Sequence, residues 1–227
     1  FVHGDTATTL SISLSAFYNK ISISHIEAGL RTFDLNSPWP EEANRKLTSV
    51  ITNFHFAPTE KSKSNLLKEG YSSKSIFVTG NTVIDSLLWV KHKLDKNINL
   101  NNEFLKRFHF VDNNKKIILI TGHRRENFGT GFENICMAIR SLAMEFPDVN
   151  FTYPVHLNPN VRGVVSKVLH SLANVFLIEP VDYQSFVFLM DRSYFILTDS
   201  GGIQEEAATL NKPVLVMRNT TERPEGI

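Results

Sequence analysis

The chain has 227 residues, of which 42% are hydrophobic and 21% are charged, a composition typical of an ordinary globular protein. Its 24 lysine and arginine residues nearly balance its 23 acidic residues, so the net charge of +1 argues against a nucleic-acid-binding surface. No apolar stretch approaches the roughly 20 residues that a membrane-spanning helix needs. A single cysteine, Cys136, excludes an intramolecular disulfide. We therefore expect a cytoplasmic protein without a nucleic-acid or membrane partner.

Short β-branched or apolar runs alternate along the chain with segments of helical period. Strands are predicted at residues 21–25, 53–57, 75–79, 116–121, 149–154, 174–178, 194–198 and 214–217, and a truncated strand precedes Gly4. Helices are predicted at residues 8–18, 41–51, 60–69, 82–93, 131–146, 160–172, 183–191 and 202–210. This alternation predicts an α/β fold of parallel sheets that helices cover on both faces.

One segment, residues 91–115, interrupts the alternation because it is rich in Lys, Asn and Asp and contains turn-forming residues at 111–114. We place a domain boundary there. Residues 1–108 are expected to form the remainder of an N-terminal Rossmann-like domain, and residues 109–227 a truncated C-terminal Rossmann-like domain. Such a pair of domains binds its ligand at the carboxyl ends of the strands, in the cleft between them.

Polar residues follow the first two strands. Asp5 comes after Gly4 at the end of the truncated strand, where the alternative reading is a residue that caps the next helix. Glu27 and Arg31 follow the strand at 21–25, and a surface ion pair between them is the plainer alternative. Glycines between these charged residues allow the tight turns that a polar cleft wall needs.

The helix at 41–51 begins with two acidic residues. Glu41 and Arg45 fall on one face at a spacing of four residues, whereas Glu42 is explained as a first-turn charge that complements the helix dipole. Carboxylates at neighbouring strand ends suit proton transfer on one bound ring, because that chemistry needs such groups to converge.

In the second half, His123 and Arg124 follow the strand at 116–121, where a histidine beside arginine suits acid–base chemistry near an anion. Ser200, Gly201 and Gly202 join the strand at 194–198 to a helix. Glycines at a helix N-terminus let a phosphate approach backbone N–H groups, although a plain strand–turn–helix connection explains the sequence as well.

Eight stretches together resemble the UDP-N-acetylglucosamine (UDP-GlcNAc) 2-epimerase family, specifically its bacterial non-hydrolysing type. They are HGDTATT, HIEAGLRT, SPWPEEANR, TGNTVIDSLLWV, TGHRREN, YPVHLNPNVR, TDSGGIQEEA and MRNTTERPEG, in family order along the whole chain. The resemblance implies the glycosyltransferase-B architecture of two Rossmann-like domains. The family's amino-terminal loop and carboxyl-terminal helices have no counterpart in these residues, so a fragment lacking both termini is expected.

The resemblance also implies an isomerase that inverts carbon 2 of UDP-GlcNAc to give UDP-ManNAc for cell-surface polysaccharide. UDP is eliminated to form 2-acetamidoglucal and then added back, without metal or redox cofactor, and a homodimer is expected. By motif position the catalytic residues are Asp5, Glu27, Glu41 and His123, and which carboxylate acts as the base stays open. The substrate-binding residues are Arg45, Phe186 near the uracil, Ser200, Gly201 and Gly202 at the diphosphate, and Glu206 at the ribose.

Arg124 and His156 match positions that bind a second UDP-GlcNAc as activator. For His156 the alternative is a helix-entry residue that satisfies backbone groups. Val181 departs from the glutamine of many bacterial members, so a polar contact near the nucleotide is expected to be missing. The competing function is a hydrolysing 2-epimerase that releases UDP and free ManNAc. A glycosyltransferase on the same fold and an inactive nucleotide-sugar binder fit the complete set of catalytic motifs less well.

Overall fold

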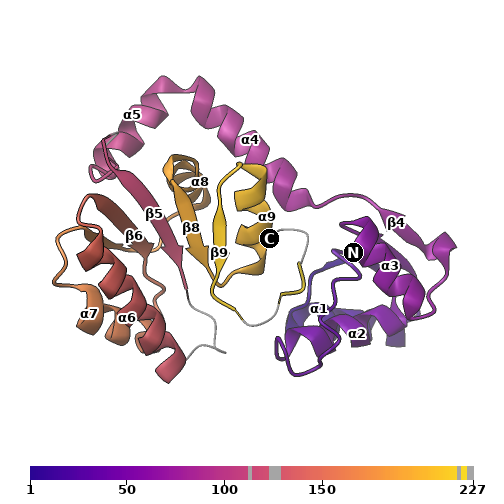
Figure 1. Cartoon of the computed structure of the whole chain (residues 1–227). Helices are drawn as coiled ribbons and strands as arrows, with labels where there is room; N and C mark the ends of the chain where they lie inside the picture. Colours follow the sequence, from indigo (N-terminus) through magenta and orange to yellow (C-terminus); the bar gives the residue numbers. More distant parts are fainter. Residues whose placement is uncertain (112–113, 123–128, 219–220, 224–227) are drawn as a thin grey trace. The chain divides into compact units, whose positions relative to one another are not determined.

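The computed structural model describes residues 1–111, 114–122, 129–218 and 221–223. These residues form two compact units: residues 1–82 with 221–223 make up the first, and the described residues between 83 and 218 make up the second. Within each unit the strands form one parallel sheet, with orders β1-β2-β3-β4 and β7-β6-β5-β8-β9. The predicted α/β class with two Rossmann-like units is confirmed (Figure 1).

The first unit runs from strand to helix in regular alternation. Its elements are β1 (Val2–His3), α1 (Ala7–Tyr18), β2 (Ser24–Ile26), α2 (Glu41–Ile51), β3 (Phe54–Ala57), α3 (Glu60–Lys68), the 3₁₀ turn η1 (Ser73–Ser75) and β4 (Ile76–Val78). Successive parallel strands lie side by side in chain order, so right-handed crossovers bring the connecting helices to one face of the sheet. Thr6 and Thr59 begin α1 and α3 by accepting hydrogen bonds from first-turn backbone N–H groups.

Side chains of the first sheet alternate between its two faces. His55 and Ile76 are buried on one side in register with each other, and Ile76 belongs to the same apolar cluster as Leu66 of α3. On the other side, the rings of Phe1, Phe56 and Phe77 stack in a row, with centroids 6.2 and 5.6 Å apart. The carboxyl ends of these parallel strands lie at one edge of the sheet. The candidate functional residues Asp5 and Glu27 come just after strands that end at this edge.

The second unit contains the longer sheet. Its elements are α4 (Thr82–Lys96), α5 (Ile98–Arg107), β5 (Lys116–Thr121), α6 (Thr130–Glu145), β6 (Val149–Pro154), α7 (Pro159–Leu169), β7 (Val175–Ile178), α8 (Tyr183–Arg192), β8 (Phe195–Thr198), α9 (Gly201–Thr209) and β9 (Val214–Val216). Chain order within the sheet reverses at β5, because β6 pairs with one of its sides and β8 with the other.

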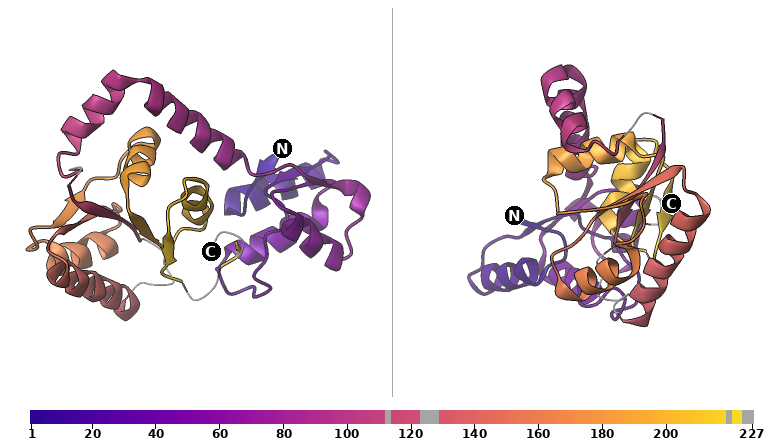
Figure 2. Two further views of the ribbon diagram at one scale, coloured as in Figure 1. Left: turned by 45° about the horizontal axis from the view of Figure 1, so that its top comes forward. Right: turned by 90° about the vertical axis from the view of Figure 1, so that its left-hand side faces the viewer.

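Alternation along β5 explains why helices cover both faces of this sheet. Ile117 and Leu119 are buried against α4, α5, α8 and α9, whereas Ile118 and Ile120 are buried against α6 and α7. The ribbon views show helices on both faces of this sheet (Figure 2). Each such buried side chain contributes about 1.5–3 kcal/mol relative to exposure. The central strand is therefore the least tolerant of polar substitution.

The division into units differs from the boundary expected at residues 108 and 109. Helix α4 buries Leu87, Val90 and Leu94, and α5 buries Phe104, in the apolar core that also contains Leu119. These side chains tie both helices to the second unit, so the compact units separate after Thr82. Helix α5 was not predicted at all, because its Asn-rich sequence resembles a linker.

Candidate functional site

The first group of polar residues lies at the carboxyl edge of the β1–β2 pair. Gly4 follows β1 with a positive φ of 72°, which turns the chain sharply before Asp5. A Cβ atom at Gly4 would stand 3.4 Å from Oε2 of Glu27, so the segments that carry the two acids pass close to each other. Thr6, not Asp5, caps α1. The capping alternative for Asp5 is therefore wrong, and its carboxylate is used elsewhere.

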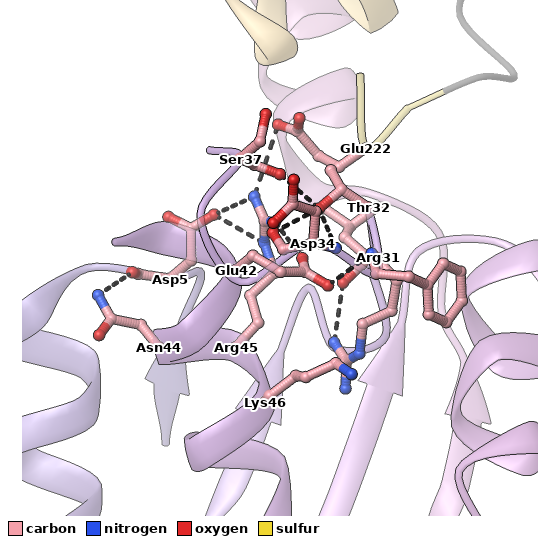
Figure 3. Close-up of polar contacts among 12 residues, drawn as sticks. Asp5, Arg31, Thr32, Asp34, Ser37, Glu42, Asn44, Arg45, Lys46 and Glu222 are labelled. Carbon is pink, nitrogen blue, oxygen red and sulfur yellow. Dashed lines mark hydrogen bonds and ion pairs between the residues drawn. The ribbon is translucent and has the colours of Figure 1, made fainter. Parts of the chain in front are cut away.

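Arg45 holds that carboxylate in place. Its Nε and Nη2 atoms donate to Oδ2 of Asp5 at 3.0 and 2.7 Å, and its Nη1 donates to Oε2 of Glu42 at 2.8 Å (Figure 3). Asn44 adds a hydrogen bond of 2.8 Å to the Asp5 carbonyl. Arg45 is only 2% exposed. A guanidinium buried among carboxylates gives them charge compensation and a fixed orientation.

Glu42 does more than complement the dipole of α2. Its side chain is fully buried, and Oε1 accepts a 3.0 Å hydrogen bond from the backbone N–H of Phe33. Glu42 does lie in the first turn of α2, but the interpretation that it only complements the helix dipole is wrong, because the residue links the loop before α2 to Arg45.

Glu41 behaves differently from its neighbour. Among the described residues, Arg45 forms ion pairs with Asp5, Glu42 and Glu222 but not with Glu41. Oε2 of Glu41 is buried and has no hydrogen-bond partner among the described residues. A buried carboxylate oxygen without a partner is costly in a folded protein and is expected where a ligand completes the site.

Glu27 stands in a strained backbone conformation, with a positive φ of 66° that non-glycine residues rarely adopt. Its Oε1 accepts a 2.8 Å hydrogen bond from Nη2 of Arg223, and its Oε2 lies 3.8 Å from Nε2 of His3. The expected alternative of a Glu27–Arg31 ion pair is wrong: Arg31 is buried and forms its ion pair with Glu69.

Two residues of this group, Glu222 and Arg223, are not among the site residues predicted from the sequence, although they lie in the MRNTTERPEG stretch that resembles the family. Glu222 and Arg223 lie in the first unit and are 3% and 9% exposed. Oε1 of Glu222 accepts a hydrogen bond from Nη1 of Arg223. The same oxygen lies 3.6 Å from Nη2 of Arg45 (Figure 3). The sequence signal that could have identified them is an acidic and a basic residue side by side within a stretch that resembles the family.

Behind these acids, two histidines lie in register on β2 and β3. His25 and His55 are buried, and burial lowers the pKa of each ring to about 4. The Nε2 atom of His25 lies 2.7 Å from the carbonyl oxygen of Gly4, and so supports the turn that leads to Asp5. Both rings are therefore neutral at neutral pH.

In the second unit, the predicted diphosphate turn lies where the strand order reverses. The Thr121 and Thr198 hydroxyls lie 2.6 Å apart at the ends of β5 and β8, and Asp199 donates its backbone N–H to the Thr121 carbonyl at 3.1 Å. The crevice beside such a reversal is the usual ligand site of an open α/β sheet.

Ser200 is the N-cap of α9 and makes no side-chain capping hydrogen bond. Its backbone N–H instead donates to the Thr198 hydroxyl at 3.0 Å. A Cβ atom added at Gly202 would meet nothing within 4 Å, so the first turn of the helix has open space beside it. First-turn N–H groups and the helix dipole make this a suitable position for an anion.

Two further predicted contacts lie near this turn in the sequence. Glu206 is 5% exposed and accepts a 2.7 Å hydrogen bond from the Tyr183 hydroxyl, and burial raises the pKa of its carboxyl. Phe186 packs, partly buried, against the core shared by α4, α5, α8 and α9. The ribose and uracil contacts assigned to these residues stay predictions.

The remaining candidates concern the expected acid–base histidine and the activator site. His123 and Arg124 lie outside the described residues. His156 is exposed after β6, and its Nδ1 atom accepts a 3.1 Å hydrogen bond from the Asn158 backbone, next to the N-cap of α7. The backbone-satisfying role is therefore observed, and the regulatory role stays a prediction.

Within the described ranges, no group of three or more His, Cys, Asp or Glu side chains has a geometry that could hold a metal ion. Nor is any described helix long and apolar enough to span a membrane.

Comparison with known proteins assigns the family. The sequence profile of the UDP-N-acetylglucosamine 2-epimerases matches residues 1–227. The chain is 58% identical over 226 residues to the UDP-N-acetylglucosamine 2-epimerase of Yersinia pestis, covering all of this chain and 60% of that protein. Among solved structures, the Neisseria meningitidis UDP-GlcNAc 2-epimerase bound to UDP-GlcNAc is 57% identical with a TM-score of 0.97, covering 99% of this chain and 60% of that one. A Staphylococcus aureus structure with UDP is 50% identical with a TM-score of 0.90, covering 99% and 58%. The chain thus spans about 60% of the length of these relatives, and it belongs to the UDP-N-acetylglucosamine 2-epimerase family.

Proposed function

We propose that the whole protein catalyses reversible epimerisation at carbon 2 of UDP-GlcNAc to UDP-ManNAc, by the non-hydrolysing route. In this reaction the carbon-2 proton is removed, the bond between carbon 1 and the diphosphate oxygen breaks, and a carbon 1–carbon 2 double bond forms. UDP leaves and 2-acetamidoglucal remains. Protonation of carbon 2 from the opposite face and return of UDP to carbon 1 complete the epimerisation without net gain or loss of atoms.

The observation that carries this proposal is the pair of carboxylates at one sheet edge, Asp5 and Glu27, each with an arginine partner. Asp5 is oriented by Arg45, Glu27 is oriented by Arg223, and Glu41 keeps a buried oxygen without a partner among the described residues. Carboxylates placed in this way can move a proton and stabilise the positive charge that develops on a sugar ring as its bond to phosphate loosens. Which of the three removes the carbon-2 proton stays open.

The second unit supplies the position for the leaving group. The Ser200-Gly201-Gly202 turn offers first-turn N–H groups at the strand-order reversal, and a relative 50% identical to this chain has been solved with UDP. An anion held at a helix N-terminus is stabilised as negative charge grows on it. We assign the diphosphate to this turn, with Phe186 beside the uracil and Glu206 at the ribose.

The proposal extends to partners and pathway. The bound relative from Neisseria meningitidis supports UDP-GlcNAc as the substrate. A second UDP-GlcNAc acting as activator through Arg124 and His156, a homodimeric assembly, and the supply of ManNAc for cell-surface polysaccharide in the cytoplasm complete the proposed role.

Solvent deuterium incorporation at carbon 2 tests the chemistry directly. Asp5→Asn, Glu27→Gln and Glu41→Gln are each expected to slow incorporation into recovered substrate by about 10²-fold or more, the usual scale for acid–base groups. Affinity for UDP should change little, since the diphosphate is assigned to the other unit. Wild-type exchange rates in all three variants would refute the assignment. Phosphorus NMR separates the two branches of the family, because only a hydrolase accumulates free UDP.

A further inference from the structure

Glu222 is a buried carboxylate that the proposed chemistry does not yet use. Its side chain is 1% exposed, and one of its oxygens, Oε1, contacts the guanidinium groups of both Arg45 and Arg223. Those two arginines each hold one of the proposed catalytic acids, Asp5 and Glu27. Glu222 is therefore the residue that the two arginine–acid pairs have in common.

We propose that Glu222 is a positioning residue, which fixes the Asp5 and Glu27 carboxylates relative to each other by holding Arg45 and Arg223 on a shared anchor. The inference rests on the proposed 2-epimerase function and assigns Glu222 no contact with substrate. It acts only through the two arginines.

The geometry of the contacts supports this role. Arg45 reaches Asp5 through Oδ2 alone, by two hydrogen bonds of 3.0 and 2.7 Å. Arg223 reaches Glu27 through Oε1 at 2.8 Å. Each arginine thus binds one carboxylate oxygen of its acid. The direction in which the second oxygen of that carboxylate points therefore depends on the position of the guanidinium group. A shift of either guanidinium would move a reacting oxygen with it, and displacements of about 1 Å cost on the order of 10²-fold in rate.

Charge explains why the anchor must be acidic. Arg45 and Arg223 are 2% and 9% exposed, and two buried guanidinium groups repel each other unless an anion lies between them. Glu42 forms an ion pair with Arg45 through a different guanidinium nitrogen, Nη1. The carboxylate of Glu222 contacts both guanidinium groups and so compensates their charges where they approach each other.

The chain position of Glu222 also separates it from the strand-end acids. Asp5 and Glu27 follow β1 and β2, whereas Glu222 returns to the first unit 195 residues after Glu27. The carboxylate cluster is therefore assembled from two distant parts of the chain, and its completion depends on residues 221–223 being in place.

Substitution of Glu222 in the whole protein tests the proposal, with kcat and KM measured by deuterium incorporation at carbon 2. Glu222→Gln keeps the size of the side chain and removes the charge, so kcat should fall by about 10-fold or more. KM and the affinity for UDP should stay within about 3-fold, as the diphosphate is assigned to the second unit. Glu60→Gln is the matched control, because that carboxylate lies on α3 of the same unit with its side chain 76% exposed and should leave all three quantities unchanged.

A double-mutant cycle separates positioning from a loss of stability. If Glu222 acts through Arg45, then adding Glu222→Gln to an Arg45→Lys background should lower kcat by much less than it does in the wild type. Additive losses of kcat would overturn the proposal. Where Glu222→Gln does not fold, Glu222→Asp decides: it keeps the charge but withdraws the oxygen, so a folded variant with reduced kcat supports the inference and one with wild-type kcat overturns it.

Glu41→Gln, measured in the same assay, distinguishes a failure of the role proposed for Glu222 from a failure of the proposed function. Loss of exchange in Glu41→Gln together with wild-type kcat in a folded Glu222→Gln would remove the role of Glu222 and leave the proposed function standing. Wild-type exchange in Asp5→Asn, Glu27→Gln and Glu41→Gln would instead refute the proposed site itself.

Discussion

Acidification is expected to destabilise the first unit through His25 and His55, which lie in register on β2 and β3. Both rings are buried, and the Nδ1 atom of each has no hydrogen-bond partner among the described residues. Burial lowers each pKa from 6.5 to about 4. The unfolded chain therefore binds more protons than the folded one as the pH falls from 6.5 towards 4, so stability is lost over that range.

The charges around the rings reinforce this direction. Arg31 lies near both rings and lowers both pKa values, and His25 lowers that of His55. Asp5 and Glu69 act in the opposite sense but do not outweigh burial. With a folded pKa of about 4, each ring costs about 2 kcal/mol of unfolding free energy at pH 5 and about 3 kcal/mol once fully protonated. A typical domain has a free energy of unfolding of about 5–15 kcal/mol, so the loss caused by two such rings is a large fraction of its stability.

Hydrogen exchange measures this loss within one unit. Amides of β2 and β3, corrected for the intrinsic pH dependence of exchange, should lose protection between pH 7.5 and pH 5, and amides of β5 in the second unit serve as the internal reference. His55→Leu removes one titrating ring and should keep about 2 kcal/mol of the protection that the wild type loses at pH 5. His92→Leu, at an exposed position on α4, should behave as the wild type.

Direct titration gives the decisive result. If nitrogen NMR shows the rings of His25 and His55 in the folded protein protonating near pH 6.5, burial does not control them and the reasoning is refuted. The same conclusion follows if His55→Leu loses as much protection as the wild type.

Three further outcomes are expected. Gly201→Val should weaken UDP binding by about 10-fold or more in calorimetry, because a side chain would enter the space assigned to the phosphate, whereas Gly163→Val on α7 should not; equal affinities would contradict the assignment. Turnover should survive EDTA, since Asp5, Glu27 and Glu42 already have arginine counterions; activity lost with EDTA and restored by a divalent ion would count against it. Gly29→Ala should cost more than about 3 kcal/mol in thermal unfolding, because φ is +90° and its Cβ would meet the Ser62 carbonyl oxygen at 2.3 Å, whereas Gly70→Ala has open space and should cost about 1 kcal/mol; the reverse order would be inconsistent with this packing.

Local patterns were sufficient to predict most of the elements. The strand at 116–121 was predicted with its observed bounds, because β-branched residues face a core on both sides of the sheet. Helix α5 escaped prediction because Asn and Lys dominate Ile98–Arg107. Its stability comes instead from the cap at Asn97 and from the packing of Phe104 against Phe188, 5.3 Å between ring centroids, which no local pattern contains.

In the candidate site, too, local sequence patterns predict some residues and miss those that depend on contacts between distant segments. Asp5 and Glu27 were found because each follows a strand, and parallel strands bring their carboxyl ends to one edge whatever the side chains are. Arg223 does not directly follow a strand: six residues separate it from the end of β9, and it reaches Glu27 across 196 positions of sequence. A rule based on strand ends therefore identifies the acids and misses the cations that orient them. Because a buried carboxylate needs a counterion, an unpaired acid predicted at a strand end is itself a reason to search distant segments for an arginine. Applied here, that search would have found the adjacent Glu222 and Arg223 in a stretch whose resemblance to the family had already been noticed.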